Sequence, residues 1–311
     1  MEPEVSAEGV RFRVPDAGYR EVRLHQSVER PRNGPAFALD DGVWELEFRR
    51  PQVDRLEYAI AIDGEPGKHD AIEFPGYRPP RWLQAPDPGP PRRVDERTQL
   101  WQPAGTDPRR PLPLLVAHDG SEYLSTAQLT RFVAHAIDEH RIPPCRVALL
   151  DSPRREEEYS ASARYASALT ARLPHLAPAP TVAGIGASLG ALALLHARAR
   201  HPGAFQALFL QSGSFFRHRW DKHEAGFPRF ERIARFVGTV LRAGPAATPL
   251  PVTLVCGAPE ENLANNRAVA GALRRQGHDV AFHIFRDAHN FVAWRDTLDP
   301  HLSTLLARAW G

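Results

Sequence analysis

Residues 181–196 read Thr-Val-Ala-Gly-Ile-Gly-Ala-Ser-Leu-Gly-Ala-Leu-Ala-Leu-Leu-His, an apolar run that is interrupted by small residues and then continues as a helix-forming sequence. The run contains the pattern Gly-x-Ser-x-Gly, with Ser188 between Gly186 and Gly190. In this pattern the serine occupies a sharp turn between a strand and a helix, and the glycines let both pass without a side-chain clash. The stretch therefore predicts a strand, an exposed serine hydroxyl, and a helix whose free N–H groups face developing negative charge.

The pattern by itself is weak evidence, because a chain of this length contains it by chance roughly one time in ten. Its surroundings strengthen it: residues 181–184 read as a short buried strand and 191–200 as a helix rich in Ala and Leu. A dinucleotide-binding Gly-x-Gly-x-x-Gly beginning at Gly184 is excluded, because Leu189 stands where the third glycine would be.

Length, charge and cysteine content argue against several classes of protein, among them nucleic-acid-binding, membrane and disulfide-rich proteins. The 311 residues suffice for one large domain or two ordinary ones, and the formal net charge of +2 favours neither a nucleic-acid nor a membrane partner. The sequence contains no apolar run of membrane-spanning length, and its first residues, Met-Glu-Pro-Glu, are acidic where a secretory signal would be basic and then apolar. We therefore expect a cytoplasmic protein. Two cysteines, Cys145 and Cys256, are too few for a disulfide framework or a zinc site. We expect neither a metal nor an organic cofactor.

Residues 1–80 predict a small all-β domain of the immunoglobulin-like, early-set kind. Four segments alternate apolar and polar residues between turn signals: 10–14, 21–25, 43–48 and 55–62. Such a domain either recognises substrate or serves packing alone, and both interpretations stay open. Residues 81–112 are rich in proline and predict a linker and lead-in, with 97–102 as the candidate first strand of the second domain.

Residues 113–311 alternate between strand-like and helix-like segments. The expected strands are 114–117, 146–150, 181–184, 207–210, 252–256 and 280–285, and the expected helices are 125–139, 161–172, 191–200, 230–242 and 265–276. Repeated strand–helix units predict a doubly wound, mainly parallel sheet of the α/β-hydrolase kind, with ligands bound beyond the carboxyl ends of the strands.

A serine hydroxyl needs a base to accept its proton and a carboxylate to orient that base. In the doubly wound arrangement the acid and then the histidine follow the serine, each after a late strand. His289 follows the strand 280–285, whereas His278 precedes that strand and lies at the opposite end of the sheet. His289 is therefore the predicted base.

The predicted acid is Glu260, which comes three residues after the glycine that ends strand 252–256. Glu261 stays open as the alternative. Asp287 is disfavoured because it is too close in sequence to His289 to approach the imidazole from the far side.

An oxyanion hole needs two backbone N–H groups aimed at the developing negative oxygen. One is expected from Leu189, the residue after the serine. The other is expected from the loop after strand 114–117, where Ser121 is the first choice and Gly120 the second.

With these residues identified, the chain resembles the enterochelin esterase, or esterase D-like, family of α/β-hydrolases. The resemblance covers nearly the whole chain and rests on the following motifs: Asp41–Glu45, His118–Gly120, Ile142–Pro144, Asp151, Arg154–Tyr159, Gly186–Gly190, Gln211–Phe216, His289-Asn290 and Trp294-Arg295. It implies ester hydrolysis with Ser188 as nucleophile, His289 as base and Glu260 as acid. Related sequences often carry two glycines before the histidine, where this chain has Asp287 and Ala288.

The resemblance also implies a small-molecule ester substrate. Family members open iron-siderophore lactones of the catecholate type, while relatives hydrolyse simple esters or transfer acyl groups. An acyltransferase and a ligand-binding homologue without turnover therefore stay open as alternatives, and the oligomeric state is not indicated.

Four further residues are candidates for contact with the substrate. Arg154 and Arg155 follow the strand that ends near Asp151 and could bind an anionic group, or instead form ion pairs with the neighbouring glutamates. Phe215 and Phe216 could line an acyl or aromatic pocket, or belong to the core.

Overall fold

The computed structural model describes residues 2–26, 28 and 34–311, which pack as two units. Unit 1 contains the residues up to Pro79 together with two short segments, Gly257–Glu261 and Ile284–His289. Unit 2 contains the remaining residues from Pro80 onward. The two segments that contain the predicted acid and the predicted base therefore pack with the N-terminal residues.

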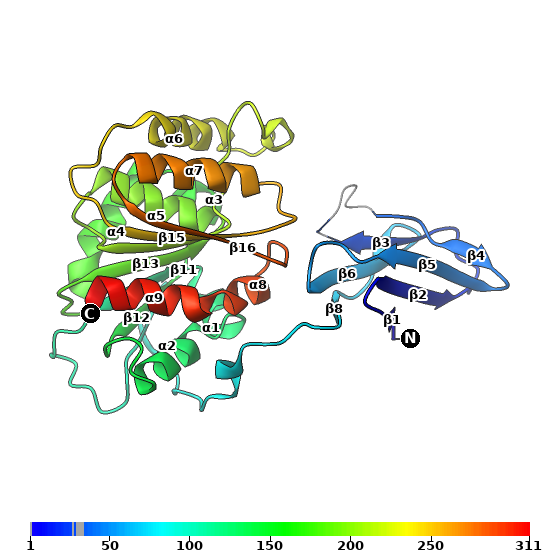
Figure 1. The fold of residues 1–311 in the computed structure, drawn as a ribbon, viewed down its shortest axis with the longest axis horizontal. Helices are drawn as coiled ribbons and strands as arrows, with labels where there is room; N and C mark the ends of the chain where they lie inside the picture. The colour runs from blue at the N-terminus through cyan, green and yellow to red at the C-terminus, as the bar shows by residue number, and fades with distance from the viewer. Residues whose placement is uncertain (1, 27, 29–33) are drawn as a thin grey trace. The chain divides into compact units, whose positions relative to one another are not determined.

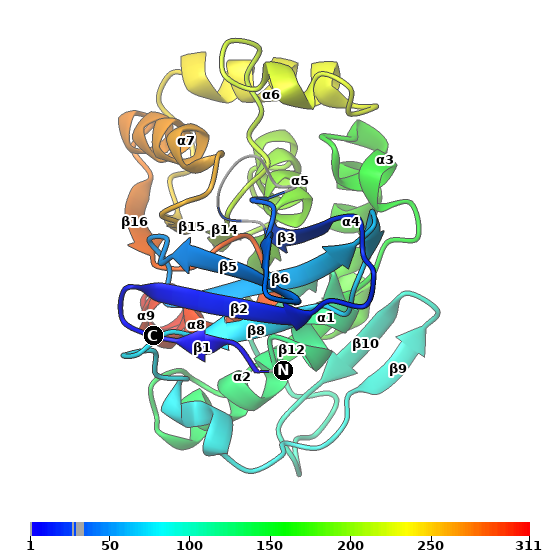
Figure 2. The same ribbon diagram turned by 90° about the vertical axis from the view of Figure 1, so that its right-hand side faces the viewer.

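Unit 1 is built on two antiparallel sheets that face each other (Figure 2). One sheet has the order β1-β2-β5-β4 and consists of β1 (Glu4–Val5), β2 (Gly9–Pro15), β5 (Val43–Arg49) and β4 (Ala38–Asp40). In the other, β6 (Arg55–Ile62) pairs with β3 (Val22–Gln26), β7 (Glu65–Pro66) and β8 (Asp70–Glu73). Apolar side chains from both sheets, such as Phe12, Leu24 and Leu56, form one buried cluster. The expected β-sandwich is confirmed.

An eight-stranded sheet is the centre of unit 2. Its order is β16 (Asp279–Phe285), β15 (Pro251–Gly257), β14 (Ala207–Gln211), β13 (Val182–Ala187), β11 (Leu114–His118), β12 (Arg146–Leu150), β10 (Thr98–Trp101) and β9 (Arg92–Asp95). The strands from β15 to β12 pair in parallel, and β10 and β9 add an antiparallel edge. The carboxyl ends of the parallel strands therefore share one edge of the sheet.

Helices cover both faces of this sheet (Figure 1). On one face lie α3 (Arg155–Tyr159), α4 (Ala163–Leu176), α5 (Leu189–Arg200), α6 (Phe230–Arg242) and α7 (Leu263–Arg275). On the other lie α1 (Gly120–Ser125), α2 (Leu129–Asp138), α8 (Phe291–Asp296) and α9 (Leu298–Trp310). Coverage of both faces confirms the predicted doubly wound α/β class.

Several local expectations differ from the structure. The helix expected over 125–139 begins at Leu129, because Gln128 has a φ of 48° and separates α2 from α1. The proline-rich stretch 81–112 includes the short 3₁₀ helix Arg81–Gln84 and strand β9, neither of which was expected, whereas β10 is the strand expected over 97–102. Among the described residues, no helix is both long and apolar enough to cross a membrane.

Candidate active site

Ser188 occupies the turn between β13 and α5, in a backbone conformation that L-residues rarely adopt. Its φ of 55° and ψ of −120° lie outside the ordinary allowed regions, and such strain concentrates at functional sites. The Ser188 N–H donates to the carbonyl oxygen of Gln211 at 2.8 Å, and its own carbonyl accepts from Ser214 at 3.1 Å. Contacts with the neighbouring strand end therefore hold the turn in place.

The two glycines of the motif are required by close packing. A Cβ at Gly186 would lie 2.7 Å from the carbonyl carbon of Gly190, and one at Gly190 would lie 3.1 Å from the Cβ of His118. The first distance is one that real Cβ atoms essentially never show. The motif thus gives strand and helix the close approach that the turn needs.

The Ser188 hydroxyl lies 3.0 Å from the hydroxyl of Ser214, which is 5 % exposed. Ser214 follows a short segment held by two asparagines of the α7 region: Asn262 Nδ2 donates to the Ser212 carbonyl, and Asn266 Nδ2 to the Gly213 carbonyl. Sequence reasoning missed Ser214 as a neighbour of the nucleophile. Its position just past β14, the strand beside β13, is the signal that could have revealed it.

In unit 1, Glu260 and His289 form a hydrogen-bonded pair. The imidazole Nδ1 lies 2.7 Å from Glu260 Oε2, while Glu260 Oε1 accepts the Gly257 N–H at 2.7 Å. The Glu260 side chain is 3 % exposed and that of His289 is 40 % exposed. A buried carboxylate hydrogen-bonded to Nδ1 fixes the orientation of the imidazole ring. The adjacent Glu261 is exposed.

Of the predicted oxyanion donors, Leu189 is the first residue of α5, where N–H groups have no partner inside the helix. Ser121 lies in the first turn of α1, but its N–H donates to Asp151 Oδ1 at 3.0 Å and its hydroxyl contacts Asp151 Oδ2 at 2.5 Å. Gly120 precedes it, and a Cβ there would meet the Leu149 carbonyl carbon at 2.5 Å. The α1 turn is thus packed directly against β12.

Both predicted substrate arginines form ion pairs inside unit 2. Arg155 donates from Nε and Nη2 to the two carboxylate oxygens of Asp119, each at 2.8 Å. Arg154 donates to Glu158 at 3.1 Å. The pair of Arg154 with a neighbouring glutamate was expected from the sequence, whereas Asp119, which is 36 positions from Arg155 in the chain, was not.

The two predicted phenylalanines have different environments. Phe215 is fully buried in the apolar cluster of unit 2, so its side chain belongs to the core. Phe216 is partly buried and stacks on Phe230, with ring centroids 5.9 Å apart. Of the two, Phe216 is the one with surface left for a ligand.

His118, at the end of β11, is fully buried beneath the serine turn. Its Nδ1 donates to the Gly190 carbonyl at 3.1 Å and its Nε2 accepts from the Tyr165 hydroxyl at 2.8 Å. Burial lowers the pKa of His118 to about 4. The ring is therefore neutral near pH 7 and serves as a structural hydrogen-bonding group under α5.

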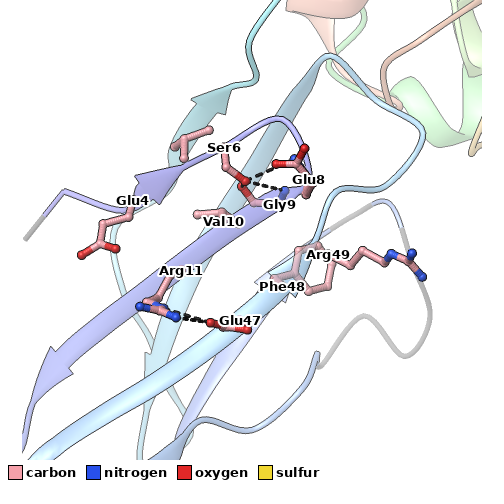
Figure 3. Close-up of a pocket in the computed structure, with 10 residues that line it drawn as sticks. Glu4, Ser6, Glu8, Gly9, Val10, Arg11, Glu47, Phe48 and Arg49 are labelled. Carbon is pink, nitrogen blue, oxygen red and sulfur yellow. Dashed lines mark hydrogen bonds and ion pairs between the residues drawn. The ribbon is translucent and has the colours of Figure 1, made fainter.

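A pocket of about 510 Å³ on unit 1 is lined by residues of β1, β2 and β5 (Figure 3). Arg11 and Glu47 in its wall form an ion pair with each other, and the Ser6 hydroxyl accepts the N–H groups of Glu8 and Gly9. These polar groups satisfy one another, and the pocket contains neither Glu260 nor His289.

Three of the solved structures with a similar fold are esterases. The enterobactin esterase from Shigella flexneri, crystallised in the presence of enterobactin, is similar at 16% identity over 99% of this chain and 95% of that chain, with a TM-score of 0.75. The ferric enterobactin esterase from Salmonella typhimurium is similar at 18% identity over 97% and 96%, with a TM-score of 0.74. A ferulic acid esterase shares 13% identity over 69% of this chain and 92% of that chain, with a TM-score of 0.55.

No curated protein sequence matches the chain significantly. The model of the Esterase family, described as "Putative esterase", matches residues 95–305. This match covers more than half of the chain and includes the serine turn, Glu260 and His289. The chain therefore belongs to the Esterase family, and the protein is a carboxylic ester hydrolase.

Proposed function

We propose that the protein is a serine esterase that works through an acyl-enzyme, with Ser188 as nucleophile, His289 as general base and Glu260 as the orienting acid. The observation that carries the proposal is the hydrogen bond of 2.7 Å between the buried Glu260 carboxylate and His289 Nδ1. A carboxylate–imidazole pair of this kind is what a weak serine nucleophile requires.

The reaction then proceeds in two halves. Ser188 Oγ attacks the ester carbonyl as His289 Nε2 accepts its proton, and the same proton passes to the leaving alkoxide, which departs as an alcohol. Water attacks the acyl-enzyme with His289 again as base, and the acid is released. Glu260 holds the ring in the Nδ1–H tautomer and stabilises the imidazolium formed in each half.

The tetrahedral intermediates place negative charge on the former carbonyl oxygen. We propose that the Leu189 N–H stabilises this charge together with an N–H from the Gly120–Ser121 turn. The Ser121 N–H, the first choice from the sequence, must release Asp151 Oδ1 before it can donate to an oxyanion. Gly120 is the alternative donor from the same turn.

For the substrate we propose a siderophore-type polyester lactone built on catecholate acids. This rests on the likeness to enterobactin esterases, which spans 97–99% of this chain and so includes the N-terminal sandwich, whereas the ferulic acid esterase matches only 69%. Partly exposed Phe216 and the exposed Trp220 supply aromatic surface suited to catechol rings.

The test compares wild type with Ser188→Ala and His289→Gln on p-nitrophenyl acetate, butyrate and octanoate and on a catecholate trilactone. We expect turnover by wild type and a loss of at least about a thousandfold in kcat for Ser188→Ala. A fluorophosphonate probe should label wild type at Ser188 and leave Ser188→Ala unlabelled.

Full activity in Ser188→Ala would refute the serine mechanism. A trilactone hydrolysed no faster than the p-nitrophenyl esters would refute the substrate assignment alone. Product analysis with an added alcohol distinguishes hydrolysis from acyl transfer, because only an acyltransferase yields the new ester as its main product.

A further inference from the structure

We propose that the N-terminal sandwich is a positioning element for the acid–base pair, with Asp54 and Arg55 as its positioning residues. This inference rests on the proposed roles of Glu260 and His289. Its basis is that unit 1 combines the sandwich with the two segments that contain these residues, Gly257–Glu261 and Ile284–His289.

Asp54, just before β6, is joined to the segment before the histidine through both main chain and side chain. The Asp54 N–H donates to the Arg286 carbonyl at 2.7 Å, and Arg286 Nε donates to Asp54 Oδ1 at 3.0 Å. Arg50 Nη2 also donates to Asp54 Oδ1, at 2.8 Å. Because these side chains are partly exposed, the ion pairs contribute little stability, and their main effect is to fix the position of the main chain at Arg286.

The next two residues, Asp287 and Ala288, are both nearly fully buried. Ala288 belongs to the apolar cluster of the sandwich, together with Val53 and Phe74. The Asp287 carboxylate lies 4.0 Å from the guanidinium of Arg55, which is also buried. Their side chains give the segment contacts with the sandwich that glycine could not make.

The acid segment is held through the histidine segment. Its Ala258 N–H donates to the Phe285 carbonyl at 2.8 Å. Gly257 approaches the Asp287 carbonyl so closely that a Cβ there would lie 2.2 Å from the oxygen. Anything that shifts Arg286–Ala288 therefore shifts Glu260 and His289 together. A misplacement of a catalytic group by about 1 Å can lower the rate roughly a hundredfold, so the contacts of the sandwich with these segments affect the catalytic rate.

The test uses full-length Asp54→Ala and Arg55→Met, with Asp54→Asn as the conservative variant. Asp16→Ala is the matched control, because Asp16 accepts from Trp44 Nε1 at 2.9 Å within the same sandwich but has no contact with either segment among the hydrogen bonds of the described residues. We measure kcat and KM on p-nitrophenyl butyrate, the rate of fluorophosphonate labelling, and folding by circular dichroism.

We expect Asp54→Ala and Arg55→Met to lower kcat about tenfold with KM changed less than about twofold, and to slow labelling in parallel. Asp54→Asn, which keeps an oxygen acceptor for Arg286, should recover most of the rate, and Asp16→Ala should change stability alone. Folded variants with wild-type kcat and labelling would overturn the positioning role while wild type remains an active esterase. Failure of the proposed function is recognised separately, by a wild type that neither turns over esters nor labels at Ser188.

A different observation points to a second site, inside unit 2. A cavity of about 380 Å³ lies between the ends of α5 and α6, with apolar walls that include Leu195, Phe236 and Leu273. Arg198 also lines it, is 7 % exposed, and has a buried Nε with no hydrogen-bond partner among the described residues. Within the part of the chain that the structure describes, the Arg198 guanidinium donates hydrogen bonds to the carbonyl and hydroxyl oxygens of Thr248. No aspartate or glutamate of this part lines the cavity.

A buried guanidinium without a carboxylate partner carries a desolvation cost that an anionic ligand would offset. The cavity volume falls in the range of small-molecule sites. We infer that the cavity takes a monocarboxylic acid with an apolar body, and that Arg198 binds its carboxylate.

The probe is octanoate, titrated calorimetrically into enzyme whose Ser188 has been blocked by fluorophosphonate. We expect binding to blocked wild type, a loss of at least about tenfold in affinity for Arg198→Met, and weaker binding of uncharged octanol. Thr239→Trp, at an exposed wall position, should block the cavity without touching Arg198. Equal octanoate affinity in wild type and both variants, or binding abolished by the Ser188 block, would overturn the site.

Discussion

Arg155 and Asp119 are joined by two parallel hydrogen bonds of 2.8 Å at the turn that follows β11. Asp119 is 8 % exposed and has a φ of 57°, so the pair holds a strained residue next to the predicted oxyanion turn. The guanidinium also lies over the Tyr159 ring, 5.7 Å from its centroid. The Arg155 side chain is therefore engaged on two sides by its own chain.

We predict that Arg155→Gln lowers the free energy of unfolding by about 2 kcal/mol, because it leaves the Asp119 carboxylate buried without its cation. This is less than a fully buried pair costs, since the Arg155 side chain is 38% exposed. Denaturant unfolding measures this loss of stability. Arg154→Gln is the control, because the Arg154 side chain is exposed, and it should change the free energy of unfolding by less than about 0.5 kcal/mol. If Arg155 has only a structural role, Arg155→Gln should change KM equally for anionic and neutral esters. A selective rise for anionic esters would instead show that Arg155 binds substrate.

Glu260→Gln should lower kcat by about a hundredfold or more, because an amide no longer enforces the Nδ1–H tautomer of His289 or stabilises the imidazolium. Glu261→Gln, one residue away and exposed, is the matched control and should keep kcat within about threefold of wild type. Steady-state kinetics on p-nitrophenyl butyrate decides between them. The reverse ranking would make Glu261 the catalytic acid.

Gly186→Ala should destabilise the protein by about 1–3 kcal/mol or prevent folding, because its Cβ would lie 2.7 Å from backbone atoms of Gly190 that cannot move aside. Gly203→Ala, where no atom lies within 4 Å of the added Cβ, should stay within about 0.5 kcal/mol of wild type. Thermal and urea denaturation measure both. Equal stability of the two variants would show that the turn relaxes more readily than its packing indicates.

The burial of His118 predicts a pH dependence of stability. Its pKa is lowered by burial from 6.5 to about 4, so between these pH values the unfolded chain binds a proton that the native protein does not. The free energy of unfolding therefore falls as the pH falls, by up to about 1.4 kcal/mol per pH unit from this residue. His118→Gln should show a shallower fall between pH 6.5 and 4 than wild type. The exposed His175→Gln should match wild type, and parallel curves for all three would contradict the assignment.

Much of the catalytic part of the fold is encoded locally. The helix expected over 230–242 is α6 without a shift in its bounds, and the strand expected over 280–285 begins one residue earlier, at Asp279. Periodicity predicts such elements because each must bury one face. It fails for the helix expected over 125–139, which begins only after Gln128, and neither α3 nor the two C-terminal helices were expected from the sequence.

The sequence by itself determined the class of fold and the serine turn, since an apolar strand, small residues at fixed spacing and a helix are properties of neighbouring residues. The sequence also predicted His289 and Glu260 as partners, because both follow late strands. Only the tertiary structure decided the other partners: Arg155 is paired with Asp119 across 36 positions and Asp54 with Arg286 across 232. Contacts between residues so far apart depend on the order of strands in the sheets and on the docking of loops. These are set by the packing of the whole chain, and no local pattern records them.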